Sequence, residues 1–237
     1  MQNFLKAEWR KLALANYAIQ PSLLSKYLPA KTELDLWNGT CYVSLVGFMF
    51  LNTTVKGFKV PYHINFEEVN LRFYVKYHDP VEGLKRGVVF IKEIVPRPAL
   101  TFVANAVYGE HYQTLPMTHV WEDSHASLNV EYRWKQKLKW NSIEVKAGKP
   151  SQDFLLGSEE EFITEHYWGY PKINPSKTSA YEVAHPRWEV YPVKDYHIDV
   201  DFGNLYGTEF HLLKYEKPLS VFLAEGSEVI VRGGFIL

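Results

Sequence analysis

Hydrophobic and polar positions alternate most regularly over residues 68–76. The apolar side chains recur at every second position, as Val69, Leu71, Phe73 and Val75. A period of two places successive side chains on opposite faces of a sheet, so this segment is predicted to be a β-strand. Turn-forming residues at 78–83 and a β-prone segment at 87–95 predict that the strand returns as an antiparallel hairpin.

Other segments predict further strands. The dipeptide Asn38-Gly39 is typical of a tight turn and precedes a predicted strand over residues 41–50. Residues 127–140 and 143–147 are predicted to form an antiparallel pair around the two residues between them. From residue 181 to 235, short apolar segments are interrupted by proline and glycine, which is typical of short strands joined by turns.

Three short helices are predicted between the strands. Residues 21–28 begin with a proline, which suits the first turn of a helix. Residues 99–108 carry apolar side chains at helical spacing, with Gly109 as the C-terminal cap. Ser158 begins a capping-box pattern, because a glutamate follows three residues later, and it predicts a helix over residues 158–169.

Together these elements predict one mainly β domain over residues 1–237 with a few short helices. Aromatic residues make up 16% of the chain, and they favour pleated, half-buried surfaces. The chain contains no internal repeat and no linker that would divide it. Many short strands in one unit of this length are typical of a closed barrel or a sandwich.

Charge and cysteine content exclude several classes of protein. The 26 basic and 27 acidic side chains give a formal net charge of -1, which argues against a general nucleic-acid surface. Residues 133–140 interleave cations with tryptophans, but a strand with a solvated basic face explains this pattern fully. No apolar run approaches the roughly 20 residues of a membrane span, and residues 1–10 are too charged for a signal peptide. Cys41 is the single cysteine, so no internal disulfide can form, and we expect a cytoplasmic protein. From the charge and the apolar runs, we expect that it binds neither nucleic acid nor membrane.

The common motifs for nucleotides, zinc proteases and serine hydrolases do not occur in the sequence. The nine histidines are scattered, and no two of them share one helical face. We therefore expect no cofactor and no metal ion. The number of subunits is left open by the sequence.

Several segments are similar to the YqjF-like family, a domain of unknown function grouped with the acetoacetate-decarboxylase-like superfamily. The matching segments follow one another along most of the chain: residues 4–10, 34–39, 43–48, 66–75, 86–91, 93–100, 108–112, 115–117, 165–170 and 185–188. The resemblance implies an acetoacetate-decarboxylase-like closed antiparallel β-barrel with a pocket in its interior.

The reaction of that superfamily does not follow from the fold. Acetoacetate decarboxylases form a Schiff base on a lysine, and the resemblance places the corresponding segment at residues 105–114, which contain no lysine. Tyr112 lies near the nucleophile's expected position, and a phenol cannot form an imine. Lys172 follows a similar Tyr-Pro pair much later in the chain, where a solvated cation near a helix end explains it more simply.

Arg72 is the first candidate for a ligand-binding residue. It lies in the middle of the predicted strand at 68–76, on the same face as Asn70 and Tyr74. If that face lines a pocket, the guanidinium would hold a carboxylate through two hydrogen bonds. The alternative is that this face is solvated and that the apolar face fills the barrel.

Candidate catalytic residues follow from the resemblance. Glu110 or His111 could serve as a general acid or base, and Tyr112 could donate a hydrogen bond to an oxyanion. An exposed loop after a helix is the simpler alternative. Three residues of family-matching motifs are further ligand-binding candidates: Glu165, Tyr167 and His185.

Three functions compete at this point. The first is the binding of a small organic molecule, with a carboxylate favoured, inside the barrel, together with acid–base chemistry that needs no imine. The second is a decarboxylase-like lyase that uses Lys172. The third is a structural or interaction protein whose barrel is filled by its own side chains.

Overall fold

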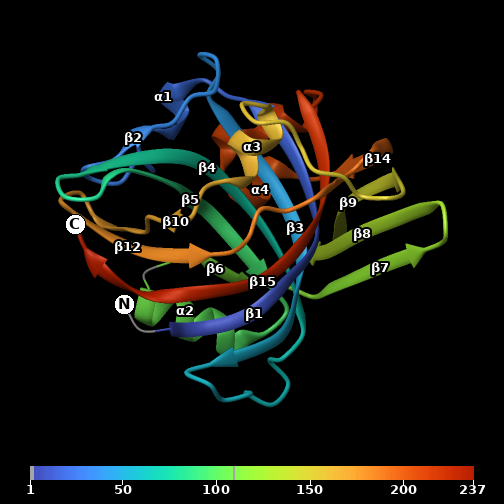
Figure 1. Ribbon diagram of the computed structural model, residues 1–237, viewed down its shortest axis with the longest axis horizontal. Coiled ribbons are helices and arrows are strands. Elements are labelled where there is room, and N and C mark those ends of the chain that lie inside the picture. Colours follow the sequence, from blue (N-terminus) through green and yellow to red (C-terminus); the bar gives the residue numbers. More distant parts are fainter. Residues whose placement is uncertain (1–2, 109) are drawn as a thin grey trace.

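The computed structural model describes residues 3–108 and 110–237, which form two β-sheets and a few short helices (Figure 1). The strands are β1 (Asn3–Ala18), β2 (Glu33–Leu34), β3 (Tyr42–Val55), β4 (Phe66–Asp79), β5 (Gly83–Val95), β6 (Tyr112–Thr114), β7 (Met117–Asp123), β8 (Ser127–Gln136), β9 (Lys139–Gly148), β10 (Trp168–Gly169), β11 (Lys172–Asn174), β12 (Lys177–Ala184), β13 (Val190–Tyr191), β14 (Val193–Asp199) and β15 (Ser220–Ile236). The helices are α1 (Pro21–Leu24), α2 (Pro98–Tyr108), α3 (Glu159–Thr164) and α4 (Phe202–Tyr206), followed by a 3-10 turn, η1 (Thr208–Lys214).

The larger sheet returns on itself. Its strands run in the order β11-β12-β10-β5-β4-β3-β1-β15-β13, and β12 also pairs with β15. The strands β12, β10, β5, β4, β3, β1 and β15 therefore form a ring, visible at the left of Figure 1. Most neighbours are antiparallel, whereas β5 pairs in parallel with both β10 and β6.

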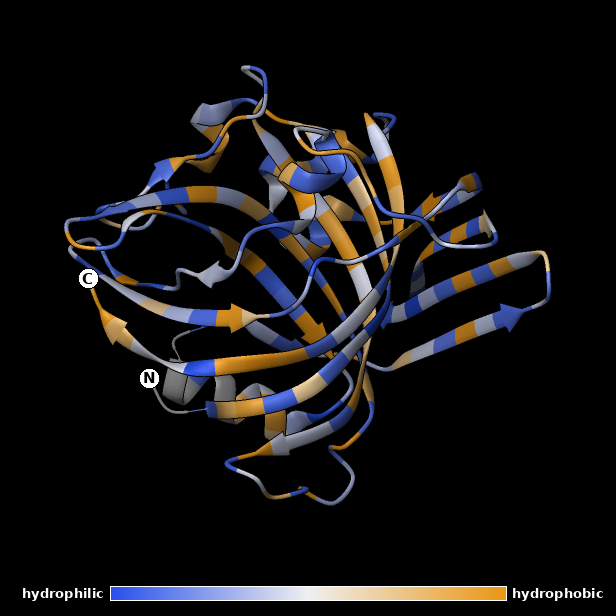
Figure 2. Cartoon of the chain, in the orientation of Figure 1, coloured by the Kyte–Doolittle hydropathy of each residue, from blue (hydrophilic) through white to orange (hydrophobic). Residues whose placement is uncertain are grey.

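The smaller sheet covers one side of this ring. It contains β14, β9, β8 and β7 in that order, and Figure 2 shows hydrophobic and hydrophilic positions alternating along β8. Its apolar face includes Trp134 and Tyr132, both with no exposed surface, which join one core cluster with side chains of β3 and β4. Removing one large apolar side chain from water contributes about 1.5–3 kcal/mol, so this interface is a main source of stability.

Strand β4 is buried on both faces, and its two faces have different roles. Val69, Leu71, Phe73 and Val75 belong to the cluster shared with the smaller sheet. On the other face, Glu68, Asn70 and Arg72 are also buried. The predicted hairpin of residues 68–95 is confirmed by the pairing of β4 with β5.

Three predicted elements, one strand and two helices, end earlier than the sequence suggested. The hairpin of β8 and β9 turns at residues 137–138, with Gln136 paired to Lys139, and not at residues 141–142. Lys137 takes a positive φ of 54° there, so the predicted continuous basic face of residues 133–140 is divided between two strands.

The helix predicted over residues 158–169 ends at Thr164. Half of the capping box forms, because the Ser158 hydroxyl accepts a hydrogen bond from the Glu161 amide at 3.3 Å, while the Glu161 carboxylate accepts from the Gly157 amide and not from that of Ser158. The chain then leaves the helix so that Trp168 and Gly169 can pair with β5 and β12. The helix predicted at residues 21–28 is likewise shortened to α1.

The helix predicted over residues 99–108 is confirmed by α2. Gly109, the predicted cap of that helix, lies outside the described residues. Within the part of the chain that the structure describes, no helix is long and apolar enough to cross a membrane.

Candidate functional site

A cavity of about 180 Å³ lies against the face of β4 that carries Glu68, Asn70 and Arg72. Most of its wall is apolar and rich in aromatic rings. The apolar and aromatic lining includes Trp9, Leu12, Phe48, Phe50, Phe66, Val88, Phe90, Leu100, Trp168, Val183 and Trp188. A cavity of this kind, with few polar groups, is typical of a site for a small organic ligand.

The register of three strands brings polar side chains together on this wall. Asn70 of β4 pairs with Glu93 of β5, and Glu93 pairs with Tyr112 of β6. Glu68 precedes Asn70 by two residues and therefore lies on the same face. The Asn70 side chain donates to Glu68 Oε1 at 3.0 Å, and the Tyr112 hydroxyl donates to Glu68 Oε2 at 3.2 Å.

A β-bulge in β5 is needed for this arrangement. Leu71 pairs with Lys92, but the next residue of β4, Arg72, pairs with Phe90, so Ile91 is an extra residue in the ladder. An extra residue reverses the alternation of faces along a strand. For this reason both Glu93 and Phe90, three positions apart, line the cavity.

Glu110 adds a third carboxyl group to the cavity. Its side chain is buried, and its Oε1 accepts a hydrogen bond from the Tyr181 hydroxyl of β12 at 2.9 Å. Glu110 also lines a second, smaller pocket of about 80 Å³. This carboxyl group therefore lies between the two cavities.

Burial changes the titration of all three carboxyl groups. Desolvation raises the pKa of Glu68 to about 7, although hydrogen bonds from Asn70 and Tyr112 act to lower it. Desolvation also raises the pKa of Glu110 to about 8, against the hydrogen bond from Tyr181. The pKa of Glu93 is well above its usual range because of burial and the neighbouring carboxyl groups. At neutral pH, Glu110 therefore mainly holds its proton and can donate a hydrogen bond, and the raised pKa of Glu93 shifts it toward the protonated form as well.

Arg72 supplies a buried positive charge to the same wall. One guanidinium nitrogen donates to the Ile163 carbonyl at 3.2 Å, and the guanidinium lies 5.7 Å from the centre of the Tyr74 ring. The Arg72 Nε is buried and has no hydrogen-bond partner among residues 3–108 and 110–237 as the structure describes them. A buried donor without a partner is costly, so the environment of the Arg72 guanidinium is not fully satisfied by the described residues.

Two histidines complete the polar lining. His166 accepts or donates a hydrogen bond at Nε2 with Asp35 Oδ2, 3.2 Å away. His185 stacks on Trp188 with ring centres 4.1 Å apart. Burial is the main cause that lowers the pKa of each histidine to about 4, so both are neutral at physiological pH.

Comparison with known proteins places the chain in a family. Residues 6–228 match the DUF2071 family, which is described as an uncharacterised conserved protein. The chain belongs to the DUF2071 family. A relative, the uncharacterised protein YqjF of Bacillus subtilis (strain 168), is 32% identical over 74 residues, which cover 31% of this chain and 31% of that protein. The YqjF-like resemblance is thereby confirmed.

Solved structures show the fold of this DUF2071 protein. Acetoacetate decarboxylase from Legionella pneumophila has a TM-score of 0.64 at 13% identity, covering 99% of this chain and 87% of that chain. MppR, an enduracididine biosynthesis enzyme complexed with pyruvate, gives 0.66 at 12% identity over 100% and 91% of the two chains. An acetoacetate-decarboxylase-like enzyme from Sphingomonas wittichii RW1 gives 0.67 at 10% identity over 100% and 94%. The mainly β, acetoacetate-decarboxylase-like fold is confirmed, and at these identities the likeness extends to the fold alone.

The cavity of the DUF2071 protein contains five of the nine residues selected from the sequence. These are Asn70, Arg72, Glu110, Tyr112 and His185. Tyr74 is buried beside the cavity wall, where its hydroxyl lies 2.7 Å from the Ser44 hydroxyl. The other three lie outside the cavity lining: His111, Glu165 and Tyr167, of which Glu165 accepts a hydrogen bond from the Tyr167 hydroxyl.

Five polar residues of the cavity were not selected: Glu68, Glu93, Thr164, His166 and Tyr181. Glu68 could have been found, because it precedes Asn70 and Arg72 at the same two-residue spacing. Glu93 could not, because regular alternation hides the bulge at Ile91. His166 and Tyr181 reach the cavity through contacts distant in sequence, for which the chain gives no local signal.

No lysine is among the described residues that line the cavity. Lys172 lines the second pocket, and its ammonium group donates to the Lys26 carbonyl at 2.7 Å. Within residues 3–108 and 110–237, no group of three or more His, Cys, Asp or Glu side chains is arranged to hold a metal ion.

Proposed function

We propose that the ring of strands is a closed barrel that binds a small organic carboxylate in its cavity and carries out acid–base chemistry on it. The observation that supports this most directly is the position of Arg72. It is a buried cation with an unpartnered Nε, on the wall of an apolar cavity that also contains three buried carboxyl groups.

The charge state of the cavity favours an anion over a cation. Because raised pKa values favour the protonated forms of Glu93 and Glu110, the main negative charge facing Arg72 is that of Glu68, whose pKa is about 7. A ligand carboxylate would pair with the guanidinium and accept hydrogen bonds from the protonated carboxyl groups. The aromatic walls favour an apolar or aromatic body on that ligand.

The chemistry proposed is proton transfer. Glu110 holds a proton that it can donate, and the Tyr112 hydroxyl can stabilise an oxyanion by hydrogen bonding. His111 lies outside the cavity and has no part in this proposal. A 2-oxo acid is proposed as one ligand class by analogy with the pyruvate complex of MppR, which has a similar fold; the choice of a carboxylate itself rests on Arg72 and the cavity lining.

A thermal-shift experiment tests binding. We expect phenylpyruvate and phenylacetate to raise the melting temperature, because a ligand that binds the native state stabilises it by mass action. Phenylacetamide and phenethylamine, which lack the carboxylate, should give little shift. Stabilisation by the amine alone would contradict the proposal.

Arg72→Met should remove the carboxylate-dependent shift. Truncating one partner of a buried charge pair costs about 2–5 kcal/mol, which corresponds to a loss of affinity on the order of 30-fold or more. Arg133→Met is the matched control, since Arg133 pairs with Glu131 on the smaller sheet. An Arg72→Met protein that keeps the wild-type response to phenylacetate would show that Arg72 does not hold the anion.

The lyase alternative predicts a different result. Borohydride added with acetoacetate or pyruvate traps an imine on a reactive lysine. We expect no covalent label detectable by mass spectrometry, because no lysine lines the described cavity wall. A label on Lys172 would establish the Schiff-base mechanism instead.

A further inference from the structure

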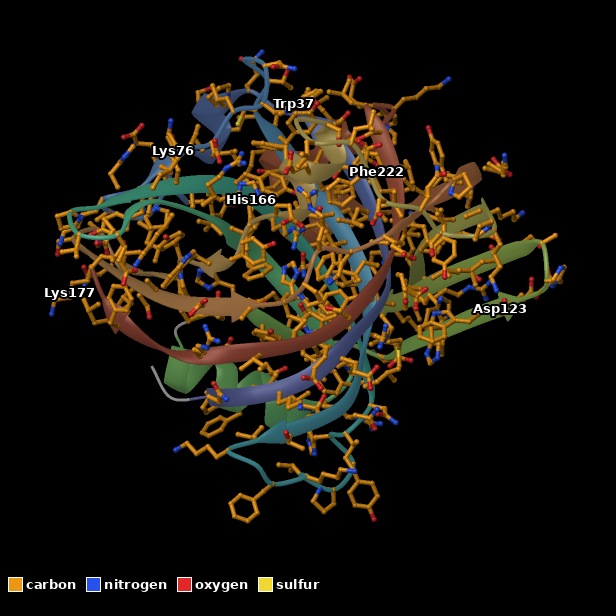
Figure 3. All side chains as sticks on the ribbon, in the orientation of Figure 1. Trp37, Lys76, Asp123, His166, Lys177 and Phe222 are labelled. Atoms are coloured by element: carbon orange, nitrogen blue, oxygen red, sulfur yellow. The ribbon has the colours of Figure 1, made fainter. Side chains whose placement is uncertain are left out.

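His166 is a buried imidazole that faces the cavity. It lies between α3 and β10, lines the cavity wall, and only 1% of its side chain is exposed. Figure 3 shows it within the ring of strands. Its ring packs between Tyr74 and Phe162, with ring centres 4.8 Å and 5.1 Å away, so its orientation is fixed by packing.

The protein determines which nitrogen of His166 carries the proton. Asp35 Oδ2 lies 3.2 Å from Nε2 and also accepts a hydrogen bond from Arg86 Nε at 2.6 Å. Burial acts to raise the pKa of Asp35, but the hydrogen bonds from His166 and Arg86 hold it below its ordinary value. An ionised carboxylate can only accept, so Nε2 bears the hydrogen of the neutral imidazole.

The other nitrogen, Nδ1, is thus left as an acceptor. It is buried and has no hydrogen-bond partner among the described residues. The charged groups around the ring are Asp35, Arg86 and Arg72; burial lowers the pKa of His166 most, Asp35 raises it, and the two arginines lower it. The imidazole is therefore neutral at neutral pH, and its Nδ1 lone pair is not used by a hydrogen bond from the described residues.

We propose that His166 is a catalytic residue that accepts a proton from the carboxylate ligand, and that Asp35 is its positioning residue. This inference rests on the proposed function. For a 2-oxo acid, the C3–H bond breaks, its proton moves to Nδ1, and its electron pair remains on the substrate as an enolate. Protonated Glu110 or the Tyr112 hydroxyl can stabilise the enolate oxygen, and the reverse step returns a proton to C3.

Deuterium exchange of phenylpyruvate tests this role. In D2O the wild-type protein should accelerate loss of the C3 proton signals above the buffer rate. His166→Gln should reduce the acceleration about 100-fold or more, in the range expected for loss of a general base. His78→Gln is the control, because His78 is exposed and distant in register from the cavity face.

Asp35→Asn separates positioning from catalysis. It should lower the exchange rate and change its pH profile, because an amide no longer fixes the tautomer or stabilises the imidazolium. In 15N spectra of the wild-type protein, His166 should be neutral with its hydrogen on Nε2 from pH 5 to 8. This measurement needs no variant, so it remains decisive if a substitution at position 166 prevents folding.

The possible outcomes distinguish the two proposals. A wild-type protein that binds phenylpyruvate without accelerating exchange would overturn the role of His166 but not the binding function. Unchanged exchange in His166→Gln, or a hydrogen on Nδ1 in the 15N spectra, would overturn it as well. If no carboxylate binds the wild-type protein, the proposed function itself is wrong, and the proton transfer fails with it.

Discussion

Replacement of Glu110 by glutamine should make the protein more stable than the wild type at pH 8 and leave its stability at pH 4.5 almost unchanged. The pKa of Glu110 is raised to about 8 in the folded state, mainly by burial, from an ordinary value of 4.5. Between these two values the native state holds a proton that the unfolded state has released. The free energy of unfolding therefore falls as the pH rises through this interval.

Glutamine resembles the protonated carboxyl group and does not titrate, so the variant avoids this loss. One pKa unit corresponds to about 1.4 kcal/mol, and coupling to Glu68 and Glu93 shares the effect among the three groups. We expect Glu110→Gln to gain about 2–4 kcal/mol over the wild type at pH 8.

Urea unfolding at pH 4.5, 6 and 8 measures this difference. Glu216→Gln, at an exposed position, should show no pH-dependent gain and serves as the control. A stability difference between Glu110→Gln and wild type that is the same at all three pH values would show that Glu110 does not carry a raised pKa.

Gly226→Ala should destabilise the protein strongly. Gly226 of β15 pairs with Arg10 of the antiparallel neighbour β1, and its φ is 81°. A Cβ at this position would lie 2.0 Å from the Trp9 carbonyl oxygen and 2.8 Å from a methyl carbon of Leu12. Because one obstacle is backbone, the two strands must separate, and we expect a loss of about 3 kcal/mol or more.

Gly39→Ala isolates the conformational part of this effect. Gly39 has nearly the same φ, 80°, but a Cβ there would meet no atom within 4 Å. It should cost only about 1 kcal/mol, the usual penalty of a positive φ for alanine. Equal losses in the two variants, measured by urea unfolding at one pH, would show that the close contact at Gly226 is not the cause.

The fold could be predicted from the sequence where local pattern and tertiary structure agree. The alternation over residues 68–76 predicted β4 because both faces of that strand meet well-defined surroundings. The turn at residues 137–138 was missed because Lys137 and Leu138 lack the usual turn residues, whereas Asn141 is buried and its side chain accepts from the Asp201 amide at 2.8 Å. Tertiary contacts there outweigh local preference.

The site could be predicted only as far as one strand carries it. Asn70 and Arg72 share a face that period two makes visible. Glu93 depends on a bulge, and His166 depends on Asp35, which is 131 residues away in the sequence. Neither relation leaves a periodic trace, so both residues required the three-dimensional structure.

The extra residue at Ile91 gives β5 an unusual sensitivity to changes in length. Deleting one amino acid there would restore strict alternation of faces along β5. Either the phenyl ring of Phe90 or the carboxyl group of Glu93 would then lie on the opposite face of the sheet, in the hydrophobic core. A single codon lost or gained at this point would therefore change the lining of the cavity more than most point substitutions. Family members whose β5 is one residue shorter or longer at this point would show how the cavity lining differs within the family.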